Sequence, residues 1–130
     1  MGINIELDAE KIVVVQLSGR VTWPQWLQAQ IEVSDILKNT REISVLAIAN
    51  RFEGWEPGTQ WEDTSFQRAH DYNITRMAIV AEHVWEDLAL MFAGQGLRPF
   101  QIEFFGPSSV KQARQWLLSD EARESEDMDA

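Results

Sequence analysis

Aromatic side chains are the residues of this chain whose types and positions first suggest chemistry. Six Trp and six Phe occur among 130 residues, and several lie in or beside expected loops and helix starts. Rings in such places can line an apolar ligand pocket. We predict that an aromatic groove between the second and third expected helices binds an apolar or lipid-like small molecule; packing of the same rings in the core is the alternative. The predicted ligand-binding residues are Phe52, Trp55, Trp61, Trp85 and Phe92.

Polar residues offer weaker candidates for catalysis or metal binding. Four carboxylates surround the aromatic loop: Glu53, Glu56, Glu62 and Asp63. General acid–base chemistry would need one of them enclosed with a shifted pKa, whereas a solvated surface or a helix start explains such acids equally well. His70 and His83 lack the i, i+4 partner of a helical zinc site. We therefore predict no catalytic residue, no metal and no cofactor: a protein that binds and is not an enzyme.

Composition and charge narrow the functional classes further. The chain has no Cys, which excludes disulfides and thiolate metal sites, and its net charge of −10 argues against nucleic-acid binding. Residues 120–130 carry half of that net charge and show no apolar period. We predict one domain over residues 1–119, followed by an acidic disordered tail over 120–130. No targeting segment or membrane span is evident, so the expected location is cytoplasmic.

The elements that must position these residues follow from apolar periodicity. Alternation over residues 3–7 and a Val- and Ile-rich run over 11–17 predict an N-terminal β-hairpin. A capping box, Thr22 with Gln25, opens a helix, and the apolar run 43–49 predicts a strand covered on both faces. A loop over residues 50–58 follows. The remaining elements are a helix over 59–72, a strand over 74–81, a helix over 84–94, a strand over 100–105 and a last helix after Pro107.

This order, ββαβαβαβα, predicts an α/β fold with a mostly parallel sheet of four or five strands and about four helices. Residues 84–100 are too apolar for a helix with one buried face. Three explanations stay open for them: contact with a membrane surface, a homodimer or protein-partner interface, and plain burial. The negative charges of Glu86 and Asp87 disfavour contact with anionic lipids.

Several segments carry a resemblance to a known family. They are residues 50–55 after the third strand, residues 61–63, His70, residues 76–80, and Trp85. With the order of elements, they make residues 3–119 similar to the SpoIIAA-like family, small bacterial relatives of the STAS domain. The resemblance implies a sheet flanked by helices, an apolar or lipid-like ligand, and membrane association through a mobile helical region. No enzymatic activity is established for the family as a whole.

One departure from related proteins bears on the function. An anti-anti-sigma factor carries an Asp-Ser pair at the start of the helix after its third strand, and a kinase phosphorylates that Ser. Residues 56–60 of this chain offer only Thr59, which a helix cap explains. Two functions therefore remain. The first is a non-enzymatic protein that holds an apolar or lipid-like ligand, with transient peripheral membrane association. The alternative is a STAS-type interaction or regulatory module without the usual phosphorylatable Ser.

Overall fold

The computed structural model describes residues 2–58, 69–94, 96 and 98–119. Its elements, in chain order, are β1 (Gly2–Leu7), β2 (Ile12–Val21), α1 (Trp23–Asn39), β3 (Ile43–Trp55), the short 3-10 helix η2 (Asp71–Asn73), β4 (Ile74–Val80), a second 3-10 helix η3 (His83–Trp85), α3 (Glu86–Ala93), β5 (Gln101–Phe105) and α4 (Val110–Leu118). The helix expected over residues 59–72 lies largely outside the described residues, and so does the tail expected over 120–130.

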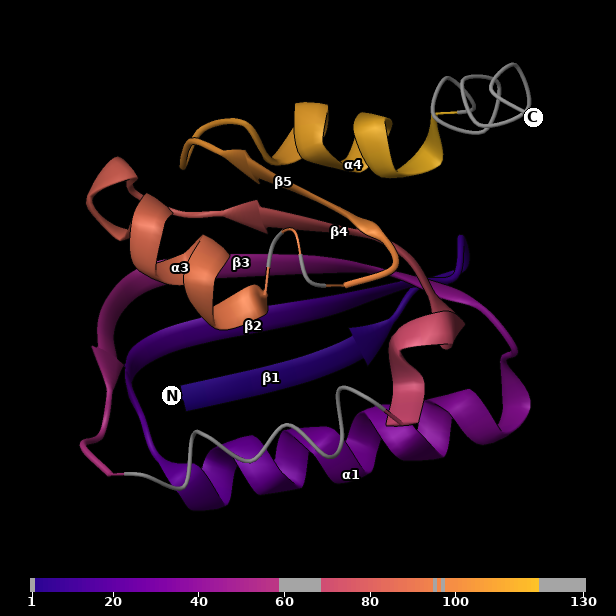
Figure 1. The fold of residues 1–130 in the computed structure, drawn as a ribbon, viewed down its shortest axis with the longest axis horizontal. Helices are drawn as coiled ribbons and strands as arrows, with labels where there is room; N and C mark the ends of the chain where they lie inside the picture. The colour runs from indigo at the N-terminus through magenta and orange to yellow at the C-terminus, as the bar shows by residue number, and fades with distance from the viewer. Residues whose placement is uncertain (1, 59–68, 95, 97, 120–130) are drawn as a thin grey trace.

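The five strands form one sheet in the order β1-β2-β3-β4-β5 (Figure 1). β1 pairs with β2 in the antiparallel direction, whereas β2–β3, β3–β4 and β4–β5 are parallel. This arrangement confirms the predicted fold class, a mostly parallel α/β sheet with an N-terminal hairpin. None of the described helices is both long and apolar enough to span a membrane.

Helices cover both faces of the sheet, and α1 and α4 lie on opposite sides of it (Figure 1). Leu46 and Ala78 pack with residues of α4, whereas Val45 packs with α1 and Ile79 with α3. Neighbouring residues of β3 and β4 thus point to different helices because side chains alternate along a strand. Both faces are covered, which explains why these strands read as continuous apolar runs.

β3 is longer than the sequence predicts. We expected a loop from Asn50, but residues 50–55 continue the strand. Phe52 pairs with Gly19 and Trp55 with Val21, after register shifts that begin beyond Leu17 of β2. These irregularities break the period-two pattern by which a strand is recognised in sequence. The loop prediction is therefore wrong over residues 50–55.

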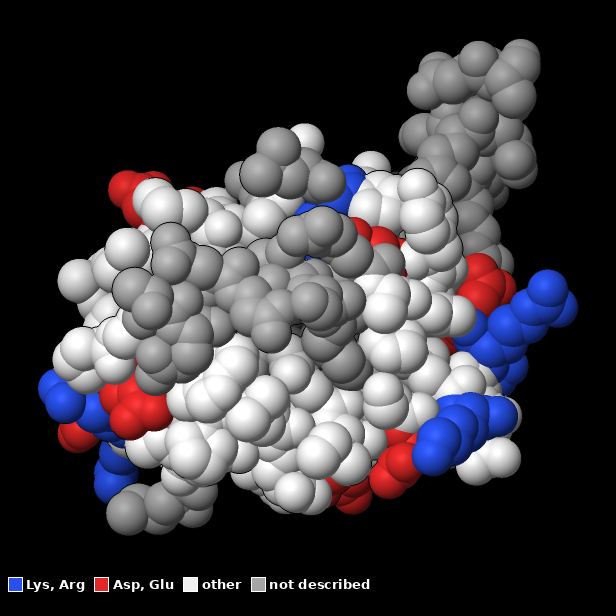
Figure 2. Space-filling view, turned by 60° about the horizontal axis from the view of Figure 1, so that its bottom comes forward, with Lys and Arg blue, Asp and Glu red and all other residues white. Residues whose placement is uncertain are grey.

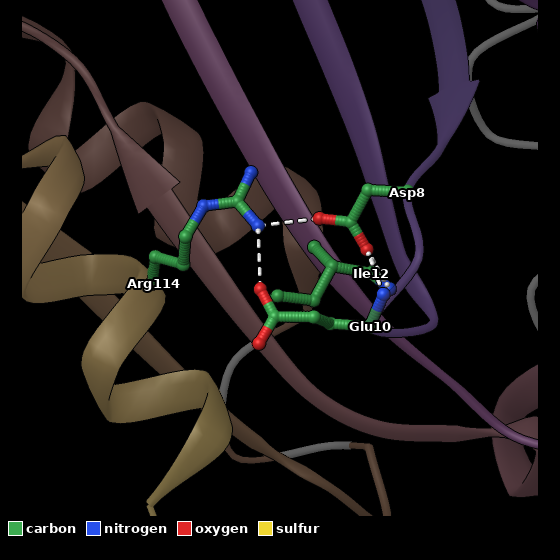
Figure 3. Close-up of polar contacts among 4 residues, drawn as sticks. All are labelled: Asp8, Glu10, Ile12 and Arg114. Atoms are coloured by element: carbon green, nitrogen blue, oxygen red, sulfur yellow. Dashed lines mark hydrogen bonds and ion pairs between the residues drawn. The ribbon is translucent and has the colours of Figure 1, made fainter.

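A network around Asp8 ties the N-terminal hairpin to the last helix (Figure 3). One Asp8 carboxylate oxygen accepts hydrogen bonds from the backbone N–H groups of Glu10, at 2.8 Å, and Ile12, at 3.0 Å. The other oxygen accepts from Arg114 of α4, whose Nη1 also lies 3.6 Å from Glu10 Oε1. The hairpin turn and α4 are far apart in sequence, so this network helps to hold the fold together.

The Asp8 network predicts a pH-dependent stability. Burial raises the pKa of the Asp8 carboxyl, but hydrogen bonds from Arg114, Ile12 and Glu10 outweigh burial and hold the pKa below its usual value. Such a carboxylate stabilises the fold above its unfolded pKa of about 3.9, and the stabilisation is lost as pH falls through the lower folded pKa. We expect Asp8→Asn to lower the free energy of unfolding at pH 7 by about 1 kcal/mol and to flatten its decline in acid.

Urea unfolding between pH 7 and pH 2.5 measures both effects. Asp35→Asn is the control, because Asp35 pairs with Lys38 on the exposed surface of α1 and should contribute little. Identical acid declines in Asp8→Asn and the wild-type protein would contradict the assignment.

Candidate functional site

An apolar cavity of about 170 Å³ lies between the sheet and the helices α1 and α3. Small side chains make room for it, since six of its described lining residues are alanine: Ala29, Ala47, Ala49, Ala81, Ala89 and Ala93. They come from α1, β3, the end of β4 and α3. Protein interiors are normally packed with few voids larger than a water molecule. A cavity of this size is therefore the clearest candidate for a functional site in the described part of the chain.

Aromatic rings form one end of the cavity and contact one another in a chain. The chain begins at Trp26 of α1, whose ring centroid lies 5.3 Å from that of Phe92 of α3, and Phe92 in turn lies 4.6 Å from Trp55 of β3. Phe52 continues the chain, 5.0 Å from Trp55 and 4.9 Å from Trp85. Three of these four pairs are edge-to-face, the geometry that the aromatic quadrupole favours. The rings therefore support one another as a wall.

The structure brings four of the five predicted ligand-binding residues to this cavity: Phe52, Trp55, Trp85 and Phe92. The fifth, Trp61, lies outside the described residues, as does most of the second helix that we expected to form one side of the groove. In the described part of the chain, α1 and α3 form the helical walls. Whether these residues bind a ligand stays a prediction.

Trp26 is a cavity residue that sequence reasoning missed. Trp26 lines the cavity, whereas Trp116 packs near Phe105 on the α4 side of the sheet. The signal was present, because Trp26, Gln30 and Val33 recur at helical spacing and all line the cavity. Periodicity identifies the inward face of a helix but does not tell a packed core from a cavity.

Irregular pairing in β3 aims its side chains at the cavity. Ala49, Phe52 and Trp55 all line it although they are three residues apart. In a regular strand such spacing would place Phe52 on the opposite face from the other two. Between them, Arg51 adopts a φ of 55° and Gly54 a φ of 101°, and the register with β2 shifts at the same places. These bulges turn successive rings toward one side.

An ion pair closes the cavity near the end of α3. Arg98, which lines the cavity, lies 2.7 Å from Asp71 of η2, and the two side chains are 11% and 14% exposed. Arg98 Nη1 also donates a hydrogen bond of 2.7 Å to the carbonyl oxygen of Ala93, and its guanidinium lies 4.6 Å from the centre of the Phe100 ring. Asp71 therefore neutralises the charge that Arg98 brings to this wall.

The carboxylates considered for catalysis have other places in the structure. Glu56 accepts a hydrogen bond from the backbone N–H of Trp23, beside the Thr22–Gln25 capping box, so it helps to fix the start of α1. Glu53 is exposed, and Glu62 and Asp63 lie outside the described residues.

The two histidines also lie close to polar partners in the structure. His70 Nε2 lies 3.2 Å from Ser34 Oγ, and the exposed His83 lies 3.8 Å from Glu86. Among the residues that the structure describes, no group of three or more His, Asp or Glu is placed to hold a metal ion.

The positive φ of Gly54 gives a test of the strand geometry behind the aromatic wall. A Cβ at Gly54 would meet Trp85 at an ordinary 3.6 Å, so a substitution there is costly through the backbone and not through a clash. We expect Gly54→Ala to lower the free energy of unfolding by about 1–3 kcal/mol in urea titrations. Gly106→Ala is the control, because its Cβ would also have ordinary room, at 3.5 Å from His83, and Gly106 has no positive φ. Equal losses in both variants would mean that backbone strain is not the cause.

Comparison with known proteins agrees with this architecture. The SpoIIAA-like family model matches residues 12–118. A solved structure of an uncharacterized protein from Shewanella loihica PV-4, described as having a SpoIIAA-like fold, superposes with a TM-score of 0.69 at 20% sequence identity, covering 89% of this chain and 92% of that one. No curated protein matches the sequence. The family match spans most of the chain and every strand after the first, so the protein belongs to the SpoIIAA-like family.

Proposed function

We propose that this protein is a non-enzymatic binding protein that holds a small apolar molecule, or the hydrocarbon part of a lipid-like one, in the cavity between the sheet, α1 and α3. The observation that carries the proposal is the cavity itself, with its alanine lining and its wall of five aromatic rings. Leaving such a space empty forfeits dispersion contacts along its whole surface. A bound apolar group would restore them.

The size of the cavity limits the ligand. Its volume is about 170 Å³, and an engineered apolar cavity of about 150 Å³ in another protein binds benzene. A benzene-sized ring or a short stretch of acyl chain therefore fits. Six buried carbons contribute about 5 kcal/mol at about 0.8 kcal/mol each, before the cost of association. We expect dissociation constants of about 0.2 mM or weaker.

The charges around the cavity favour an uncharged group at the buried end. Asp71 already neutralises Arg98. Among the described side chains of the face seen in Figure 2, uncharged ones cover much of the surface, and most charged ones lie toward its margin. Gln30 of α1 lines the cavity, and its amide makes no hydrogen bond within the described part of the chain. It could orient a ligand that carries one hydroxyl or carbonyl group, whereas a buried carboxylate would lack a counter-charge.

A cavity-filling variant separates ligand binding from simple packing. Ala47→Leu adds three carbons at the sheet wall of the cavity and removes no aromatic contact. Toluene at ten times its dissociation constant should stabilise the wild-type protein by about 1.4 kcal/mol, which is a rise in melting temperature of about 4 °C. We expect Ala47→Leu to lose this response, because the added side chain occupies the ligand's place. Differential scanning fluorimetry, with the lining tryptophans as reporters, measures it.

Two controls accompany that experiment. Ala9→Leu adds the same atoms at an exposed turn and should respond to toluene as the wild-type protein does. Benzoate should stabilise the wild-type protein and Ala9→Leu less than toluene does. Mass spectrometry of protein purified under mild conditions then identifies a natural ligand, which Trp85→Ala should retain poorly. An unchanged toluene response in Ala47→Leu would rule out the cavity as the binding site.

A second candidate function, a STAS-type protein-interaction module, is favoured by the outer face of η3 and α3. Val84 is 77% exposed, Leu88 49% and Met91 74%, and these residues recur at helical spacing as one apolar stripe. The acidic residues Glu86 and Asp87 lie beside the stripe. Together with the net charge of −10, they disfavour an anionic membrane surface and favour a partner whose apolar patch is framed by basic residues.

Met91→Glu tests this second function. Met91 is largely exposed, so we expect the free energy of unfolding to change by less than about 0.5 kcal/mol while partner binding is lost. Cross-linking in cells, followed by affinity measurement with the purified partner, is the readout. Leu118→Glu is the matched control, because Leu118 is 44% exposed on α4, on the other side of the sheet. Equal affinity in wild-type protein and Met91→Glu would exclude the stripe as the interface.

A further inference from the structure

A second and larger pocket, of about 920 Å³, lies at the amino ends of the parallel strands. The starts of β3, β4 and β5 and the end of α4 contribute to it, and polar side chains among its described lining include Ser44, Thr75, Arg76, Gln101 and Ser119. The polar character sets this pocket apart from the aromatic cavity. Arg98 and Ile74 line both.

Arg76 is the unusual residue of this pocket. It is only 6% exposed, and no other polar or charged residue in the described part of the chain is as buried. Its Nη1 donates a hydrogen bond to the carbonyl oxygen of Trp116, and its guanidinium lies 5.0 Å from the centre of the Trp116 indole ring. Within the described residues no carboxylate pairs with it. Buried charges in proteins are nearly always paired.

The end of α4 satisfies only part of Arg76. Trp116 lies in the last turn of that helix, where the helix dipole places about half a negative charge. A guanidinium has five N–H donors, and the carbonyl of Trp116 accepts one of them. Helix capping alone therefore leaves several donors and about half of the positive charge without a partner in the described part of the chain.

The other charged residues of the pocket's described lining are paired or exposed. Glu10 is near Arg114, at 3.6 Å, and Arg98 pairs with Asp71 at 2.7 Å. The remaining charged lining residues are Lys11 and Glu42, which are exposed and carry opposite charges, and Arg76 itself. Arg76 is therefore the lining charge that is buried without a carboxylate partner in the described residues.

We propose that Arg76 is the centre of an anion-binding site that takes one carboxylate or phosphate group. The planar donors of a guanidinium match two oxygens of either group, which is the geometry that makes Arg preferred over Lys for such ligands. Two sources could supply the group. One is a free small anion, and the other is the acidic segment 120–130 of this chain, which follows directly on the pocket residue Ser119.

Titration of the full-length protein with inorganic phosphate and with acetate, at constant ionic strength, tests the site. The backbone N–H signals of the pocket residues Thr75 and Gln101 in NMR spectra report binding in every variant, without depending on stability. The Arg76 Nε–H signal adds a direct report in the proteins that keep Arg76. We expect a saturable shift, a dissociation constant at least tenfold weaker in Arg76→Lys, and no binding in Arg76→Gln. Arg51→Gln removes the same charge from an exposed residue of β3 and should bind within twofold of the wild-type protein.

A second full-length variant, in which all six carboxylates of residues 120–130 become amides, distinguishes the two sources. If phosphate binds this variant at least tenfold more tightly than the wild-type protein, the acidic segment supplies the natural anion; equal binding indicates a free anion. No saturable shift with either protein would overturn the proposal. So would equal affinity in Arg76→Lys, because the pocket would then attract anions without using the guanidinium fork.

Discussion

The parallel pairing of β3 with β2 and β4 is the constraint on which the rest of the structure depends. Parallel neighbours require crossover segments; the described crossover helices α1 and α3 cover one face of the sheet, and α4, which follows β5, covers the other. Alternate residues of one strand then serve two different environments. In β4, Met77 and Ile79 face the aromatic cavity, whereas Arg76 lies on the α4 side, against Trp116. One seven-residue strand thus takes part in both pockets.

The aromatic cavity combines a wall of contacting aromatic rings with a lining of small alanine side chains. The alanine side chains leave space between the sheet and the helices. The contacts among the rings of Trp26, Phe92 and Trp55 oppose a closer approach of the helices to the sheet. Each such ring pair contributes about 0.5–1.5 kcal/mol beyond its burial, so collapse would have to give up several of them. The bulges of β3 complete the arrangement by turning Phe52 to the same side. Ring packing and backbone irregularity therefore both contribute to the aromatic wall of the cavity.

Much of the fold could be predicted from the sequence, and the details of the site could not. The apolar run of β3 and the Thr22–Gln25 capping box located their elements because local chemistry determines both. The end of β3 was mistaken for a loop, because bulges remove the alternation that identifies a strand. Phe52 and Trp55 were found through that same error, since an expected loop drew attention to them, whereas Trp85 and Phe92 were found near the helix expected over residues 84–94. Arg76 went unnoticed as a site residue, because a single charge beside an apolar run does not reveal that it is buried without a carboxylate partner in the described residues.

The position of Arg98 affects both pockets and not only the aromatic cavity. Its side chain lines both pockets, bonds to the last residue of α3 and pairs with Asp71. A ligand in one pocket that changes this pairing also changes the wall of the other pocket. Thermodynamic linkage makes such an effect reciprocal, so that each ligand would alter the affinity for the other by the same factor. If both proposed sites bind their ligands, a single ion pair would link two chemically different binding events.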